Sequence, residues 1–199
     1  MSAPRTELHA IVLAAGAARR FGALKQLQPI EGEALLLRVA RRAAAAADHT
    51  AVVLGAHAET LAPLLAEEPF VLHVNTQWAN GLASSIRTGI AALPPTCAGA
   101  MLVLADQMAI RAEHYAQLAA LWRQSPDSIV AAHYGGRAGA PAIFPRRLFA
   151  ALLALEGDVG AQSVLREHAN ALRTLAMPSA ALDLDTPADL TGRLPSAPR

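Results

Sequence analysis

Two kinds of segment alternate along the chain. Short runs rich in valine, isoleucine and leucine are typical of strands that are buried on both faces, and they occupy residues 8–13, 50–54, 70–74, 100–104 and 128–132. Apolar residues recur at helical spacing between and after these runs, over residues 33–47, 81–92, 111–123, 145–155 and 160–168. The clearest helix is expected over 33–47, where Glu31 and Glu33 near its start suit the positive end of the helix dipole.

This alternation predicts a three-layer α/β/α fold, in which helices cover both faces of a Rossmann-like, mostly parallel sheet. Ligands of such sheets bind in the crevice at the carboxyl ends of the strands. We therefore expect the functional residues in the loops that follow the apolar runs, at 14–26, 55–58, 75–85, 105–111 and 133–141. The chain shows no internal repeat and no linker, which predicts a single domain over residues 1–193 and a frayed tail at 194–199.

The composition excludes several classes of protein. Hydrophobic residues make up 53% of the 199 residues and charged residues 17%, which is unlike a disordered chain. A formal net charge of +1 provides no basic field for nucleic acid. A single cysteine, Cys97, excludes a disulfide framework, and the seven histidines show no metal-ligand spacing such as H-E-x-x-H.

Neither a membrane span nor an export signal is predicted. The longest uncharged stretch, residues 88–105, is interrupted by Pro94 and Pro95. Residues 8–18 resemble the core of a signal peptide, but Glu7 and His9 interrupt its front flank. We therefore expect a cytoplasmic protein that binds neither membranes nor nucleic acid.

The loop after the first apolar run combines small residues with two cations. It reads Leu13-Ala14-Ala15-Gly16-Ala17-Ala18-Arg19-Arg20-Phe21-Gly22-Ala23-Leu24-Lys25 and lacks both the dinucleotide fingerprint and the Walker motif. Small residues let backbone N–H groups approach an anion, and Arg19 and Lys25 can neutralise a polyphosphate. Lys25 is the only lysine among 17 basic residues. Either the site requires a compact ammonium group at this position, or Lys25 is an ordinary charged side chain on a solvated loop.

Further candidate residues follow other apolar runs. Gly81, Ser84 and Ser85 open the helix after the third run, where they can bind a base or an anion or simply cap the helix. Asp106 ends the fourth run, and a carboxylate there needs a partner such as a divalent cation. The glycine-rich residues 135–144 can contact a pterin or a phosphate, or form a surface turn.

Jointly, these segments resemble molybdenum cofactor cytidylyltransferase-like proteins of the molybdopterin guanylyltransferase-like superfamily. The first loop resembles the signature L-A-A-G-x-S-x-R-[MF]-G-x-x-K, with Ala18 in place of a common serine. The segments that resemble further family motifs are residues 81–85 (G-[LM]-x-x-S), 104–108 (L-A-D-[QM]-P), 157–162 (G-D-x-G-A-R) and 183–189 (D-[IL]-D-T-P-x-D).

The resemblance implies the fold of nucleotide-diphospho-sugar transferases and the transfer of CMP from CTP to a molybdopterin-type acceptor, with release of pyrophosphate. It implies catalytic roles for Lys25, Arg19 and Asp106. It also implies Mg²⁺ on Asp106, with Asp158 as a second metal residue and Asp185 as a weaker candidate. The residues implied to bind the nucleotide are Leu13, Ala14, Ala15, Gly16, Gly22, Gly81, Ser84 and Ser85. A molybdenum hydroxylase is the implied recipient of the finished cofactor.

Two other functions remain open, as does the choice between CTP and GTP. Ala18, Val159 and Gln162 remove polar contacts that the family commonly has, which fits a regulatory protein that binds a nucleotide without transferring it. An enzyme of nicotine degradation also resembles this family and reduces a pigment with a nicotinamide cofactor. The same scaffold can therefore carry an NAD(P)H-dependent oxidoreductase.

Overall fold

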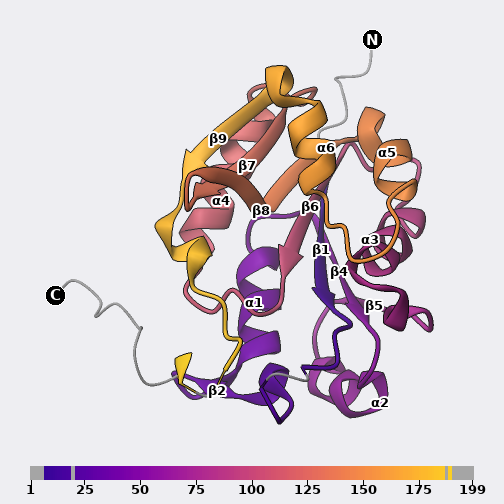
Figure 1. The fold of residues 1–199 in the computed structure, drawn as a ribbon, viewed down its shortest axis with the longest axis vertical. Helices are drawn as coiled ribbons and strands as arrows, with labels where there is room; N and C mark the ends of the chain where they lie inside the picture. The colour runs from indigo at the N-terminus through magenta and orange to yellow at the C-terminus, as the bar shows by residue number, and fades with distance from the viewer. Residues whose placement is uncertain (1–6, 19–20, 187, 190–199) are drawn as a thin grey trace, which may run out of the picture.

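A seven-stranded sheet with the strand order β5–β4–β1–β6–β8–β7–β9 organises the chain (Figure 1). The computed structural model describes residues 7–18, 21–186 and 188–189; the predicted tail at 194–199 lies outside them. The strands are β1 (Leu8–Ala14), β4 (His49–Leu54), β5 (Val71–Val74), β6 (Gly99–Leu104), β7 (Ile129–Tyr134), β8 (Arg137–Pro145) and β9 (Leu172–Ala176). Only β8 runs antiparallel to its neighbours, so the predicted mostly parallel sheet is confirmed.

Helices cover both faces of the sheet and enclose two hydrophobic cores. One core contains α1 (Leu35–Ala44), α2 (Ala58–Leu61) and α4 (Ala112–Arg123), and the other contains α3 (Leu82–Ala91), α5 (Phe149–Leu153) and α6 (Gln162–Glu167). Successive residues of a strand point to opposite faces, so alternate residues of β1 enter the two cores. Short 3-10 turns lie at Lys25–Leu27, Ala62–Leu65, Trp78–Asn80, Arg146–Leu148, Ala169–Ala171 and Pro178–Ala181. The three-layer prediction is therefore confirmed.

The helix expected over 33–47 begins later than its periodicity indicates. β2 (Pro29–Ile30) and β3 (Glu33–Ala34) form a small hairpin, and α1 starts at Leu35 with no acidic residue in its first turn. The predicted interaction of Glu31 and Glu33 with the helix dipole is wrong. Instead, Glu31 pairs with Arg38, and Glu33 Oε1 lies 2.7 Å from Arg41 Nη1. The two carboxylates thus bind basic side chains of α1.

The prediction of a loop over 133–141 is also wrong. Gly135 and Gly136, with φ angles of +56° and +75°, form the tight turn of a hairpin between β7 and β8. β8 then returns between β6 and β7. The helix expected over 145–155 starts only at Phe149 as α5, after a 3-10 turn. The glycine-rich segment therefore forms a turn, as the second of its two interpretations in the sequence predicted.

The last described segment returns to the end of β6. Figure 1 shows it in yellow, running from β9 past β6 towards the β2–β3 hairpin. Gln107 forms an isolated bridge with Asp183, and Leu184 N donates to Asp106 O at 2.9 Å. These contacts bring Asp185 to the carboxyl edge of the sheet.

Candidate active site

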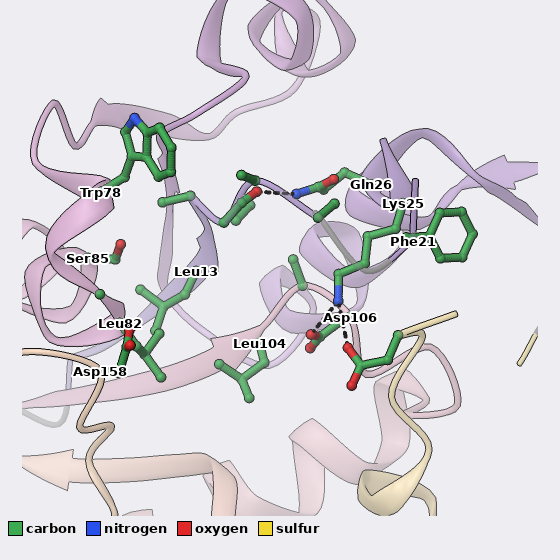
Figure 2. A pocket seen from close by; sticks show the side chains of 18 of the residues that line it. Leu13, Phe21, Lys25, Gln26, Trp78, Leu82, Ser85, Leu104, Asp106 and Asp158 are labelled. Atoms are coloured by element: carbon green, nitrogen blue, oxygen red, sulfur yellow. Dashed lines mark hydrogen bonds and ion pairs between the residues drawn. The ribbon is translucent and has the colours of Figure 1, made fainter. Parts of the chain in front are cut away.

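A cleft of about 710 Å³ lies at the carboxyl edge of the sheet, where the neighbouring strands β1 and β6 end. The loop after β1, the start of α3 and the loop after β6 form its walls, as the geometry of parallel sheets predicts. Several predicted nucleotide-binding residues line it, namely Leu13, Ala14, Ala15, Gly16, Gly81 and Ser85. Figure 2 shows Lys25 and Asp106 on one side of the cleft and Ser85, Leu82 and Asp158 on the other.

Lys25 connects two acidic segments of the chain. Its Nζ donates to Asp106 Oδ2 at 2.9 Å and to Asp185 Oδ1 at 3.2 Å (Figure 2). Lys25 is the first residue of a short 3-10 turn. Asp106 lies two residues after the end of β6, and Asp185 lies on the segment that pairs with Gln107. The single lysine therefore has a specific contact, which excludes the interpretation of a merely solvated charge.

The charges in this cluster shift each other's protonation. Burial lowers the pKa of Lys25, but the charge of Asp106 and the hydrogen bonds to Asp106 and Asp185 prevail, so its pKa lies above the ordinary value. Asp183 is exposed as a residue, yet partial desolvation of its carboxyl group, reinforced by Asp106 and Asp185, raises its pKa to about 6. Among the described residues, Lys25 forms ion pairs with Asp106 and Asp185, and the charge of Lys25 also acts on Asp183.

One oxygen of Asp106 indicates what the cluster can bind. Asp106 Oδ1 is buried and has no hydrogen-bond partner among the described residues. A buried carboxylate oxygen without a partner is unfavourable. Mg²⁺ and Mn²⁺ prefer carboxylate oxygens, and Asp185 supplies a second carboxylate on the same ammonium group. The residues present therefore fit a divalent cation.

The loop after β1 offers backbone donors to the cleft. In the part of the chain that the structure describes, no acceptor takes a hydrogen bond from the N–H groups of Gly16, Ala17 or Ala18. Gln26 Nε2 stabilises the loop by donating to Gly16 O at 3.2 Å. A row of such N–H groups forms a concavity suited to an anion.

The opposite wall is built from the start of α3. Gly81 has φ +91°, and a Cβ there would lie 2.4 Å from Asp158 Oδ1, so only glycine fits. Asn75 Nδ2 donates to Ser84 Oγ at 2.8 Å and to Ser85 Oγ at 3.0 Å. Ser84 Oγ donates to Gly81 O at 2.8 Å. Ser84 therefore fixes the backbone of the wall, whereas Ser85 lines the cleft.

Two predicted site residues, Gly22 and Asp158, are not part of the lysine–carboxylate cluster. Gly22 lies outside the cleft lining, at a turn with φ +73°. Asp158 lines the cleft beside Gly81, across from Asp106 (Figure 2). Arg19 lies outside the described residues. The structure thus groups Asp106 with Asp185 rather than with Asp158.

Sequence reasoning missed some of the cleft residues. Trp78 and Gln26 line the cleft, and Asn75 holds the side chains of Ser84 and Ser85 by hydrogen bonds. Trp78 and Asn75 fall inside the predicted loop 75–85, and Trp78 is one of only two tryptophans in a chain with 4% aromatic residues. That scarcity could have identified Trp78. Nothing in the sequence distinguishes Gln26 from a solvated glutamine.

The sheet, its crevice and the lysine–carboxylate cluster together define a protein of the nucleotidyltransferase fold. Residues 10–172 match the family described as the MobA-like NTP transferase domain. The match spans most of the chain, and the chain therefore belongs to this family. The resemblance found in the sequence is confirmed at this level.

Two relatives are similar to the chain over most of its length. The chain is 31% identical over 167 residues to nicotine blue oxidoreductase of Paenarthrobacter nicotinovorans, covering 79% of this chain and 80% of the relative. It is 29% identical over 165 residues to the purine catabolism protein PucB of Bacillus subtilis strain 168, covering 78% and 79%.

Solved structures match over almost the full length. The crystal structure of Rv0371c from Mycobacterium tuberculosis H37Rv has a TM-score of 0.80 and 27% identity, covering 94% of this chain and 97% of that one. A structure of Rv0371c in complex with manganese has a TM-score of 0.76 and 26% identity, covering 93% and 96%. Within the described residues, no helix has the length and apolar character needed to cross a membrane.

Proposed function

We propose that this NTP transferase moves CMP from CTP to a molybdopterin-type phosphate acceptor and releases pyrophosphate. One observation carries the proposal: Lys25, Asp106 and Asp185 converge beside a loop that lines the cleft and whose backbone N–H groups have no acceptor among the described residues. The family membership supports a nucleoside triphosphate as the donor. The sequence of residues 81–85, 104–107 and 157–161 supports the cytidylyltransferase branch and, with it, a molybdenum hydroxylase as the recipient of the product.

The loop after β1 binds the triphosphate in this proposal. The N–H groups of Gly16, Ala17 and Ala18 have no other acceptor among the described residues, and phosphate oxygens satisfy them. The small side chains of the loop allow this close approach. Arg19 would add positive charge, a role that rests on the sequence alone.

The carboxylates of Asp106 and Asp185 hold the divalent cation. The orphaned Asp106 Oδ1 is the first ligand, and the manganese complex of Rv0371c is consistent with a divalent metal in this family. When bound, such a cation neutralises phosphate oxygens and orients them. Lys25 Nζ, held by the same carboxylates without nucleotide, can then contact the phosphates. Asp158 lines the opposite side of the cleft, across from Asp106 (Figure 2).

The chemical step needs charge neutralisation more than proton transfer. An oxygen of the acceptor phosphate attacks the α-phosphorus of CTP, and the bond to the pyrophosphate oxygen breaks with its electron pair. The attacking phosphate is already anionic near neutral pH, so no general base is required. Lys25 stabilises the negative charge that develops on the α-phosphate and on the leaving group.

The start of α3 holds the nucleoside end. Gly81 allows the backbone to approach closely, and Ser85 and Trp78 line the same side of the cleft. An aromatic face and a hydroxyl group suit a planar, polar base.

A reduction that uses NAD(P)H is the second candidate. It is favoured by the 31% identity to a protein named nicotine blue oxidoreductase. This candidate gives no role to the buried, unpartnered oxygen of Asp106, and it therefore ranks below nucleotidyl transfer.

Thermal unfolding with a panel of nucleotides distinguishes these candidates. We expect CTP with Mg²⁺ to raise the melting temperature more than GTP with Mg²⁺ or NAD(P)H, and chelation of the metal to abolish the shift. Asp106→Asn should lose the shift with CTP, whereas Asp127→Asn, at an exposed position away from the cleft, should retain it. A larger, metal-independent shift with NAD(P)H would replace the transferase proposal with the oxidoreductase.

A further inference from the structure

A second cluster of metal-ligating side chains lies at the opposite end of the same strands. Glu7, His9 and His49 each place one ligand atom within 4.8 Å of the others. Leu8 and His49 are the first residues of β1 and β4, so the cluster lies at the amino ends of these strands. The nucleotide cleft lies at their carboxyl ends, and no residue of the cluster lines it.

The pairing of β1 with β4 creates the cluster. The two strands are parallel, and His9 is the direct register partner of His49. Glu7 precedes His9 by two residues, which puts both side chains on the same face of the sheet. Strand register thus brings together histidines that are far apart in the sequence, and for this reason the spacing of the histidines gave no metal signature.

Two of the three distances between ligand atoms are close to those of a tetrahedral zinc site. Glu7 Oε1 lies 3.0 Å from His9 Nε2 and 3.3 Å from His49 Nε2. With bonds of about 2.0–2.1 Å to nitrogen and oxygen, two ligand atoms on a tetrahedral ion lie about 3.3–3.4 Å apart. All three ligand atoms lie within 4.8 Å of one another, so a movement of the exposed His49 side chain can bring them onto one ion.

Two of the three ligands are held in place by the fold. The His9 side chain is 10% exposed within β1, and its ring lies 4.7 Å from that of His49. Glu7 O accepts hydrogen bonds from Ala98 N at 2.9 Å and Gly99 N at 3.2 Å, which fixes the backbone of the carboxylate ligand. Preorganised ligands lose less entropy on binding a metal.

The third ligand leaves the site open to solvent. The His49 side chain is 61% exposed, which gives an ion a path of entry and leaves a coordination position for water. Two imidazoles and one carboxylate favour Zn²⁺, Co²⁺ or Ni²⁺, whereas Mg²⁺ prefers an all-oxygen site. The cluster and the carboxylates in the cleft therefore favour different metal ions.

We propose that Glu7, His9 and His49 form a binding site for one divalent transition-metal ion such as Zn²⁺. The ion joins the amino ends of β1 and β4 and is independent of the nucleotide cleft. The alternative is a cluster held by the contacts of Glu7 with the two histidines alone, in which no ion binds.

Calorimetric titration of the tag-free, chelator-treated full chain with Zn²⁺ tests the proposal. We expect one equivalent of zinc to bind and the melting temperature to rise. In Asp106→Asn, where the carboxylate site of the cleft is disabled, Mg²⁺ should give no such response. His49→Ala should weaken zinc binding at least about tenfold, because it removes a direct ligand. His49 is exposed, so this variant should fold normally without zinc. Glu7→Gln should likewise weaken binding.

Two controls identify the site. His133→Ala alters an exposed histidine of β7 and should leave zinc binding unchanged. Asp106→Asn disables the carboxylate site of the cleft and should also retain it. Absence of zinc binding by the unaltered chain, or equal affinity in the unaltered chain and in His49→Ala, would overturn the proposal. A loss confined to Asp106→Asn would also overturn it by assigning the ion to the cleft.

Discussion

Lys25→Ala is the substitution with the clearest expected consequence for stability. One pair of charges about 3 Å apart attracts with about 5 kcal/mol at an effective dielectric constant of 20, before desolvation is subtracted. The side chains of Lys25, Asp106 and Asp185 are 15%, 27% and 47% exposed. They lie between surface pairs, worth about 0–1 kcal/mol, and buried pairs, whose disruption costs about 3–5 kcal/mol. We expect a loss of about 2 kcal/mol, or about 4–8 °C in melting temperature.

The same substitution should affect activity far more than stability. Removing a donor that stabilises developing charge lowers turnover about 10²–10³-fold, which pyrophosphate release from CTP in the presence of acceptor would measure. Lys25→Arg is the matched control, because it retains the charge but not the compact ammonium group. It should recover most of the stability and only part of the turnover. Lys25→Ala with reduced stability but unchanged kcat/KM would refute a catalytic role for this lysine.

Three further substitutions test other parts of the structure. Gly81→Ala should weaken CTP binding at least about tenfold in calorimetry, because a Cβ would lie 2.4 Å from Asp158 Oδ1 and the backbone has φ +91°; unchanged affinity would contradict the proposed nucleoside wall. Gly99→Ala should destabilise the fold by about 1–3 kcal/mol in urea unfolding, because its Cβ would lie 2.4 Å from Trp122 Cζ2; nucleotide affinity of the folded protein should not change. Asp183→Asn should alter the pH dependence of the free energy of unfolding. In the folded chain the pKa of Asp183 is about 6, above the ordinary 3.8, so the protonated carboxyl group favours the folded state. This stabilisation is complete below about pH 4 and is lost as the pH rises through about 6. The melting temperature of the variant, relative to the unaltered chain, should therefore increase between pH 4 and pH 7, and a constant difference would show that this carboxyl group titrates normally.

The sequence predicts most of the sheet but not its last strands. The apolar runs that became β1, β4, β6 and β7 are continuous, because these strands are largely buried inside the sheet. β5 has an apolar run as well, although it is an edge strand and its Val71 and Val74 are exposed. The first half of β8 contains Gly139 and Pro141, which are typical of a loop, and β9 is a partly exposed edge strand without an apolar run. Pairing with neighbouring strands, rather than local composition, makes these two segments into strands.

Prediction of the candidate site was limited in the same way. Lys25 and Asp106 follow recognisable strands, and the edge of a parallel sheet brings them together. Asp185 joins them only because the returning segment pairs at Gln107, a long-range contact without a local sequence pattern. The pair of His9 and His49 likewise depends on strand register. Long-range contacts therefore supply the site residues that the sequence motifs could not predict.

A crystal structure with CTP and Mn²⁺ tests the central proposal most directly. We expect the anomalous signal of manganese beside Asp106 Oδ1, the triphosphate along Gly16–Ala18, and Lys25 Nζ on a phosphate oxygen. A cleft without nucleotide, with Lys25 still bound to both carboxylates and manganese elsewhere, would contradict the proposed transfer of a nucleotide at this site.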